Sequence, residues 1–158
     1  MVDKNQAIIT FLSECPEIQS HPLYFNFSNA KDNNKQIVTT GNDKATNKPY
    51  IDGSVLKQFT FTIIDYKSIA YRAVVKESGY VDENVEDMAE VQNIIDWVED
   101  KAYDRSYPDF GPNCFIEDMR VLTDNPNLNG TDTTVTPALA KYSLSIQIQY
   151  VDYSKTLY

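Results

Sequence analysis

The sequence contains few of the residues from which most catalytic and metal sites are built. Its only histidine, His21, has no cysteine or second histidine at a metal-ligand spacing, which is more typical of a loop residue. The five glycines are scattered, so none of them belongs to a glycine-rich phosphate loop. No serine stands in a Gly-x-Ser-x-Gly motif. We therefore expect no catalytic residue, no cofactor and no metal site.

Cysteine and long apolar runs are also scarce. Cys15 and Cys114 are able to pair, but without a secretory context two free thiols are the better expectation. The segment Met1–Thr10 lacks the basic start and apolar run of a signal peptide. No apolar run approaches the roughly 20 residues that span a bilayer. We expect a protein that is made in a cytoplasm and has no membrane partner.

Basic residues are outnumbered by acidic ones. The 14 Lys and Arg residues face 23 Asp and Glu residues, which gives a net charge of −9. A free-standing nucleic-acid binder needs Lys and Arg to displace phosphate counterions, so we expect no specific DNA binding. The 158 residues, 42% of them hydrophobic, predict a single domain over residues 1–158.

The clearest pattern present is a strand from Ala140 to Tyr150, in which apolar and polar residues alternate. Apolar residues point to one side of this strand, and Lys, Ser and Gln point to the other. A second long strand with Phe59, Phe61 and Ile63 on one face is predicted over Ser54–Tyr66. Shorter strands are predicted at 23–27, 69–75 and 115–122, and 124–137 is predicted to be a polar loop.

Two helices are predicted from spacing and capping. Asp3 is a candidate N-cap with Gln6 as its capping-box partner, and the apolar stripe that follows ends at Pro16. Asn84 is the candidate N-cap of the second helix. The buried stripe of that helix is Met88, Val91, Ile94, Ile95, Val98 and Ala102, with Trp97 to one side of it.

These elements predict an α+β fold, a mainly antiparallel sheet with the two principal helices on one face, in the order helix, strands, helix, two strands. The polar stretch at 28–53 is the exception. A compact domain rarely carries so long a loop without structure. Either Gln36–Thr39 forms a small strand within it, or the stretch is an arm that becomes ordered against a partner.

Tyrosine is unusually frequent, with 11 residues. Tyrosine suits interfaces, because its ring is buried while its hydroxyl stays hydrated. An equally good interpretation is that these aromatic residues cover the edges of an ordinary core. Our interface candidates are Trp97, Tyr103, Tyr107, Phe110, Tyr150 and Tyr153, together with Tyr158.

The order of these segments resembles that of the tail-terminator and minor capsid (head–tail joining) proteins of long-tailed bacteriophages. The segments that carry the resemblance are the Phe-Thr-Phe-Thr-Ile-Ile strand, the Ile-Ile-Asp-Trp-Val helix, the Phe-Ile-Glu-Asp-Met-Arg-Val strand and the Tyr-Ser-Leu-Ser-Ile-Gln-Ile-Gln-Tyr strand. The resemblance implies a virion protein of the tail or neck that has no enzymatic activity.

The resemblance also implies partners. Such a protein assembles as a homo-oligomeric ring, typically a hexamer, which caps the tail tube protein and docks to the head connector or stopper protein. DNA passes through the lumen of the ring without specific binding. The polar stretch at 28–53 would become ordered against the tube or a neighbouring subunit, and the polar side of strand 140–150 would line the lumen or meet a neighbour.

Two other functions remain open. One is another phage structural component, a tube or stopper protein. The other is a small ligand-binding α+β domain, which would need a pocket with converging polar groups and a perturbed titratable residue. A nucleic-acid module is disfavoured, because the sequence lacks a basic groove and an aromatic stacking motif.

Overall fold

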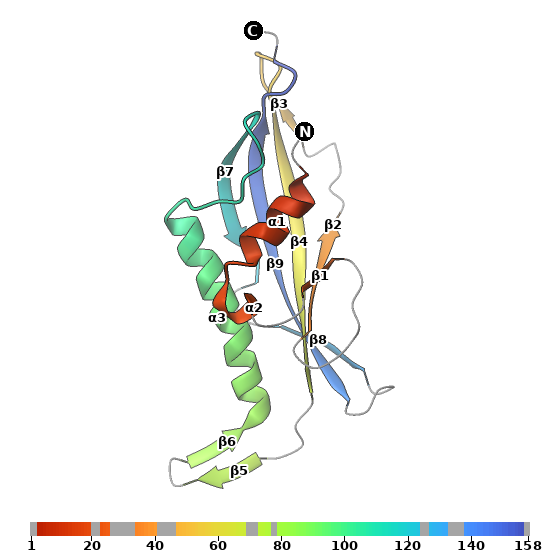
Figure 1. Cartoon of the computed structure of the whole chain (residues 1–158), viewed down its shortest axis with the longest axis vertical. Coiled ribbons are helices and arrows are strands. Elements are labelled where there is room, and N and C mark those ends of the chain that lie inside the picture. The colour runs from red at the N-terminus through yellow and green to blue at the C-terminus, as the bar shows by residue number, and fades with distance from the viewer. Residues whose placement is uncertain are drawn as a thin grey trace.

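The computed structural model describes residues 3–19, 23–25, 34–40, 47–68, 73–76, 79–123, 127–132 and 138–156. A mostly antiparallel sheet of seven strands packs against helices, so the α+β prediction is confirmed (Figure 1). The elements are α1 (Lys4–Leu12), α2 (Pro16–Gln19), β1 (Leu23–Phe25), β2 (Lys35–Thr40), β3 (Lys48–Pro49), β4 (Val55–Ser68), β5 (Ala73–Lys76), β6 (Gly79–Asp82), α3 (Glu83–Tyr103), β7 (Cys114–Val121), β8 (Asn127–Asp132) and β9 (Leu139–Asp152).

The two longest strands form the centre of the sheet. β4 and β9 are antiparallel and pair along their whole lengths. β2 pairs with the other edge of β4, and β1 pairs with β2 in parallel. The other edge of β9 pairs with β7 along one half and with β8 along the other half. β3 pairs with the start of β4, while β5 and β6 form a separate two-stranded sheet.

The alternation predicted for residues 140–150 is confirmed in β9. Its apolar side chains pack on the side of the sheet where α1 and α3 lie, which we call the covered face (Figure 1). Phe61 and Ile63 of β4 stand directly across from Ile146 and Leu144, so they share this face. The centre of the core consists of Ile8, Leu12, Phe61, Ile63, Ile94, Ile95, Leu144, Ile146 and Ile148, none more than 1% exposed.

The first helix begins as predicted but ends earlier. Asp3 is the N-cap, and its carboxylate accepts hydrogen bonds from the N–H groups of Asn5 and Gln6 at 2.9 and 3.4 Å. The Gln6 amide donates to the Thr10 hydroxyl instead of closing a capping box. α1 ends at Leu12, and Pro16 is the first residue of α2 rather than a terminator. Proline suits a first helical position, because the N–H that it lacks would have no partner there.

The second predicted helix is α3. Val91, Ile94, Ile95 and Val98 are fully buried, which confirms the predicted stripe, and Met88 and Ala102 pack against it. The helix begins at Glu83, so Asn84 is already within its first turn. The prediction that Asn84 is the N-cap was therefore wrong. Among the described residues, no helix is both long enough and apolar enough to cross a membrane.

Two strands lie in stretches of polar sequence. β2 includes Gln36–Thr39, so the strand alternative for part of the 28–53 stretch is confirmed. β8 lies inside the predicted polar loop 124–137, so the part of the chain that the structure describes has three strands after α3 instead of two. The pairing of β8 with β9 supplies the hydrogen bonds that its Asn-rich sequence does not predict. Parts of the predicted strands at 23–27 and 69–75 lie outside the described residues.

Candidate interaction surfaces

The hairpin between β3 and β4 holds an apolar side chain in solvent. Tyr50 N–H donates to the Ser54 carbonyl at 2.9 Å, and Gly53 N–H donates to the Tyr50 carbonyl at 3.1 Å. Gly53 has a φ of 90°, which glycine adopts without strain. Hydrogen bonds from the Ser54 hydroxyl and N–H hold the pKa of Asp52 below its usual value. The turn is therefore fixed in shape, yet Ile51 at its tip is 96% exposed.

Three partly exposed aromatic side chains lie at the same end of the sheet as this hairpin. Tyr50, Phe115 and Tyr153 are 40%, 56% and 43% exposed. A shallow hollow of about 610 Å³ lies here, and its apolar lining includes Val151, the strand partner of Phe115. Its described lining residues are Tyr50, Ile51, Asp52, Ser54, Glu117, Val151 and Tyr153. We call Tyr50, Ile51, Phe115 and Tyr153 the tip patch. Single exposed apolar residues are ordinary on protein surfaces, but a cluster of them is typical of a surface that binds another protein.

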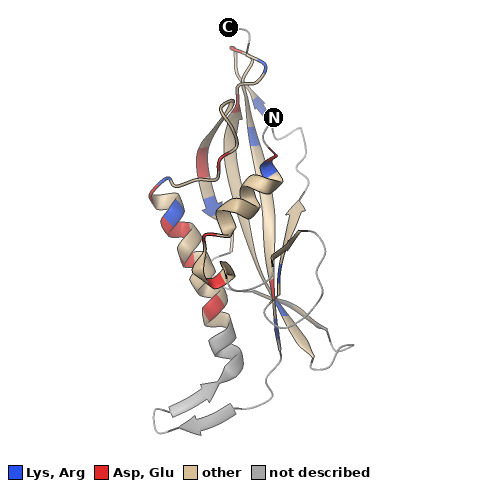
Figure 2. Cartoon of the chain, in the orientation of Figure 1, with Lys and Arg blue, Asp and Glu red and all other residues tan. Residues whose placement is uncertain are grey.

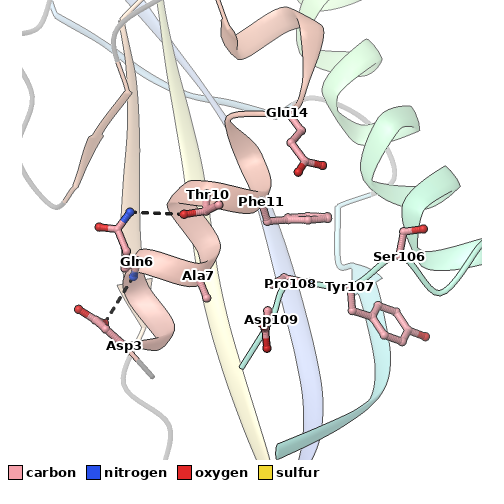
Figure 3. Close-up of a pocket in the computed structure, with 10 residues that line it drawn as sticks. All are labelled: Asp3, Gln6, Ala7, Thr10, Phe11, Glu14, Ser106, Tyr107, Pro108 and Asp109. Atoms are coloured by element: carbon pink, nitrogen blue, oxygen red, sulfur yellow. Dashed lines mark hydrogen bonds between the residues drawn. The ribbon is translucent and has the colours of Figure 1, made fainter. Parts of the chain in front are cut away.

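A groove of about 500 Å³ lies between α1 and the segment that follows α3 (Figure 3). Its apolar part is formed by Ala7, Phe11 and Pro108, with Tyr107 beside them. Among the described residues, no Lys or Arg lines the groove. The described lining residues are Asp3, Gln6, Ala7, Thr10, Phe11, Glu14, Ser106, Tyr107, Pro108 and Asp109.

The side of the sheet opposite the covered face is polar and uncharged at its centre. Thr62 and Ser145 share a hydrogen bond of 2.9 Å between their hydroxyl oxygens, and the Gln147 amide donates to Gln58 at 3.3 Å. Figure 2 shows that charges are frequent along α3 and sparse in the middle of β4 and β9. We call the following partly exposed side chains the polar face: Gln58, Thr60, Thr62, Ser145, Gln147 and Gln149.

The predicted interface residues lie in different environments. Tyr103, at the end of α3, is 89% exposed, and Tyr153 belongs to the tip patch. Tyr107 is partly buried in the wall of the groove. Trp97 is also partly buried, and its ring lies 5.0 Å from the ring of Phe11 in α1. Of these residues, Tyr103 is therefore largely exposed to solvent, and Tyr153 is exposed for less than half of its surface. Tyr158 lies outside the described residues.

The two remaining candidates, Phe110 and Tyr150, are core residues. They are 4% and 6% exposed, and their rings meet edge to face at 5.3 Å. Tyr150 is buried because it continues the apolar side of β9 onto the covered face. Burial raises the pKa of Tyr150 to about 12. Both side chains therefore offer little surface to a partner.

The residues with metal-binding or nucleophilic chemistry are dispersed. Among the described residues, no group of three His, Cys, Asp or Glu side chains is placed to hold a metal ion, and His21 lies outside them. Cys15 and Cys114 are free thiols, and burial raises the pKa of both.

Of the tip patch, only Tyr153 was predicted as an interface residue; Tyr50, Ile51 and Phe115 were not. An isolated Ile within a polar turn, Tyr50–Ser54, gives no periodic signal, and Phe115 was assigned only to a strand. One signal was available: Ile51 lies within a turn-forming stretch between Pro49 and Asp52-Gly53, where polar residues are usual.

No protein-family model matches the chain, and no curated protein matches its sequence. Its function must therefore be inferred from the surfaces themselves.

Proposed function

We propose that this protein is a structural component of a bacteriophage virion, a tail-terminator or head–tail joining protein without enzymatic activity that assembles as a ring. The observation that carries the proposal is the tip patch. The tip patch combines Ile51, exposed at the tip of a hairpin of fixed shape, with three aromatic side chains that are 40–56% exposed. A rigid apolar surface loses little conformational entropy when it binds, which favours assembly.

A closed ring requires two different patches on each subunit, because each subunit contacts its two neighbours differently. The tip patch serves as one of them. The second lies on the helical side of the molecule, where exposed Tyr103 ends α3 and Tyr107 lines the groove (Figure 3). The two surfaces share no residue, so one subunit is able to use both at once.

The polar face suits either the lumen of the ring or a neighbouring subunit. Its centre carries hydroxyl and amide groups without charge, and the whole chain has a net charge of −9. Such a ring does not hold DNA by counterion release, so DNA passes through it without specific binding. The axial partners in this proposal are the tail tube protein on one side and the head connector or stopper protein on the other.

Pelleting with tail tubes tests this function. The tubes are assembled from the tube protein encoded in the same genome, and one half of the sample is sheared into shorter tubes. A terminator binds tube ends, so the amount that pellets per mass of tube should rise in proportion to the number of ends. Binding that follows tube mass would indicate a component of the tube wall, and no binding to either sample would contradict the proposal.

A further inference from the structure

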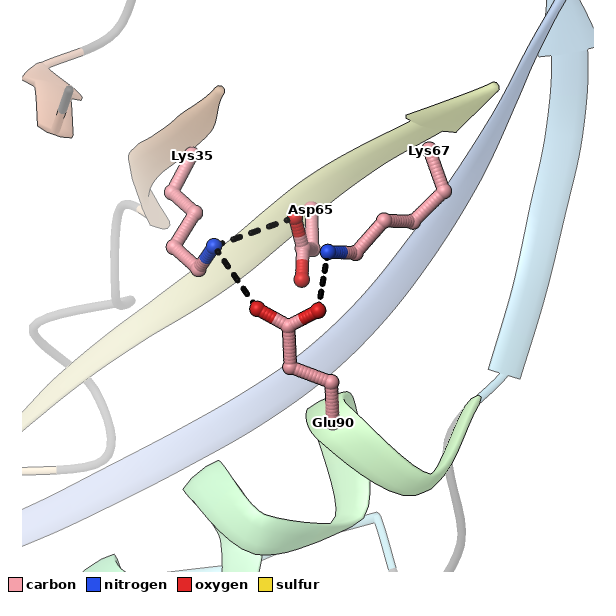
Figure 4. A network of polar contacts seen from close by, with 4 residues as sticks. All are labelled: Lys35, Asp65, Lys67 and Glu90. Atoms are coloured by element: carbon pink, nitrogen blue, oxygen red, sulfur yellow. Dashed lines mark hydrogen bonds and ion pairs between the residues drawn. The ribbon is translucent and has the colours of Figure 1, made fainter. Parts of the chain in front are cut away.

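Four charged side chains meet in the interior between the sheet and α3 (Figure 4). Lys35 of β2, Asp65 and Lys67 of β4 and Glu90 of α3 have side chains that are 0%, 1%, 2% and 24% exposed. Each of these groups gives up hydration on burial, a cost that mutual attraction only partly offsets. A chemical reaction that removes two of the charges would therefore be favoured by their surroundings.

Lys35 and Asp65 are the oppositely charged pair of this cluster that joins two strands. They are direct partners in the antiparallel pairing of β2 with β4, so both side chains point to the covered face. Lys35 Nζ lies 3.4 Å from Asp65 Oδ1 and 3.7 Å from Glu90 Oε1. The other carboxylate oxygen of Glu90 pairs with the Lys67 ammonium group. Lys67 is thus held by Glu90, while Lys35 lies between both carboxyl groups.

The Asp65 carboxyl group is the unusual member of this cluster. Neither of its oxygens accepts a hydrogen bond from the described residues. Burial raises the pKa of Asp65 to about 6, although Lys35 and Lys67 act in the opposite direction. Burial therefore favours the neutral carboxylic acid of Asp65, which is the reactive form, since a carboxylate is a poor electrophile. The attack itself requires Lys35 as a neutral amine, because an ammonium group has no free lone pair.

We propose that the side chains of Lys35 and Asp65 join in an intramolecular isopeptide bond and that Glu90 transfers the proton for this reaction. The Lys35 ammonium first gives a proton to the Asp65 carboxylate. The Nζ lone pair then forms a bond to Asp65 Cγ, and the Glu90 carboxylate accepts a proton from that nitrogen. Glu90 returns the proton to the departing Asp65 hydroxyl, the carbon–oxygen bond breaks, and one water leaves. No oxidant, reductant or other reactant is needed.

Two features of the site favour this condensation. Lys35 Nζ is already in contact with the carboxyl group that it would attack, at 3.4 Å from Asp65 Oδ1, so the two groups are held together before the reaction begins. The surrounding Ile37, Ile63 and Leu144 are at most 1% exposed, so the product water leaves a site where little water returns to hydrolyse the amide. The bond ties β2 covalently to β4, and it does not depend on the proposed function.

The mass of the intact, denatured protein tests the proposal. The wild-type chain should be lighter than its sequence by one water, and it should migrate faster than unreacted chain in denaturing electrophoresis. Trypsin should release residues 32–44 joined to residues 58–67, because the linked Lys35 is no longer cleaved. A wild-type chain that keeps its full mass after prolonged incubation overturns the proposal, as does a link that joins Lys67 or Glu90.

Variants separate this bond from other losses of water, such as succinimide formation at Asp52-Gly53. Lys35→Arg keeps the charge but has no nucleophilic amine, so it should retain its full mass, as should Asp65→Ala. Glu90→Gln should fold, as circular dichroism will show, yet lose most of the linked product. Loss of water that persists in Lys35→Arg refutes the assignment, and an equal yield of linked chain in Glu90→Gln refutes the role of Glu90.

Discussion

Replacing Ile51 by Asp should weaken self-association and leave the fold intact. The side chain is 96% exposed, so it makes almost no contact within the subunit that the substitution removes. The backbone hydrogen bonds of the turn come from Tyr50, Gly53 and Ser54, and all three are retained. The free energy of unfolding should therefore change by no more than about 0.5 kcal/mol.

The expected effect on assembly follows from the area that Ile51 would bury. Full burial of an isoleucine side chain contributes about 1.5–3 kcal/mol, and a carboxylate in its place adds a desolvation cost. Since about 1.4 kcal/mol corresponds to a tenfold change in affinity, each contact should weaken by about 10- to 100-fold.

Sedimentation velocity over a range of protein concentrations measures this change, and urea unfolding measures stability in parallel. Leu128→Asp is the matched control, because Leu128 is also an exposed apolar residue, at 53%. It lies in β8, which pairs with the half of β9 that is farther from the tip patch. The reasoning is refuted if Ile51→Asp assembles as readily as wild type, or if both variants lose assembly equally.

Three further predictions concern stability and are measured by urea unfolding followed by circular dichroism. Trp97→Ala should cost about 2–3 kcal/mol, since a partly buried ring that packs on Phe11 is lost, and Trp97→Phe should cost less. Asp3→Ala should cost about 1 kcal/mol because α1 loses its cap, whereas Asp3→Asn should be nearly neutral. Burial opposes ionisation of Asp152, but hydrogen bonds from Ser154 and Lys57 hold its pKa below the unfolded value. The Asp152 carboxylate therefore stabilises the fold by about 1 kcal/mol at most above about pH 4, and this contribution is lost as the pH falls further. Asp152→Asn should lack this contribution at every pH, so its stability should fall less than that of the wild type below about pH 4.

The elements with strong periodicity could be predicted from the sequence. β9 and β4 bury alternate residues, and α3 buries one stripe. Because each element buries a single face, its apolar residues recur in the sequence with the period of a strand or a helix. β8 could not be predicted in this way, because its Asn and Gly residues have low strand propensity and its stability comes from pairing with β9. Pro16 was misread because proline both ends helices and begins them.

The candidate surfaces were predicted less well than the fold. Tyr150 was proposed as an interface residue, although its place on the apolar side of β9 pointed to the core. The buried charges were not predicted, since charged residues in a strand usually indicate solvent. A signal was present: Asp65 and Lys67 continue the alternate positions of Phe61 and Ile63, which assigns all four to the covered face.

Electron microscopy of tail tubes mixed with the purified protein tests the central claim most directly. The account predicts a ring of subunits, typically six, at tube ends in the presence of the wild-type protein and bare ends with Ile51→Asp. Tube ends that remain bare in the presence of wild-type protein, with the protein itself still monomeric at every concentration, would contradict it.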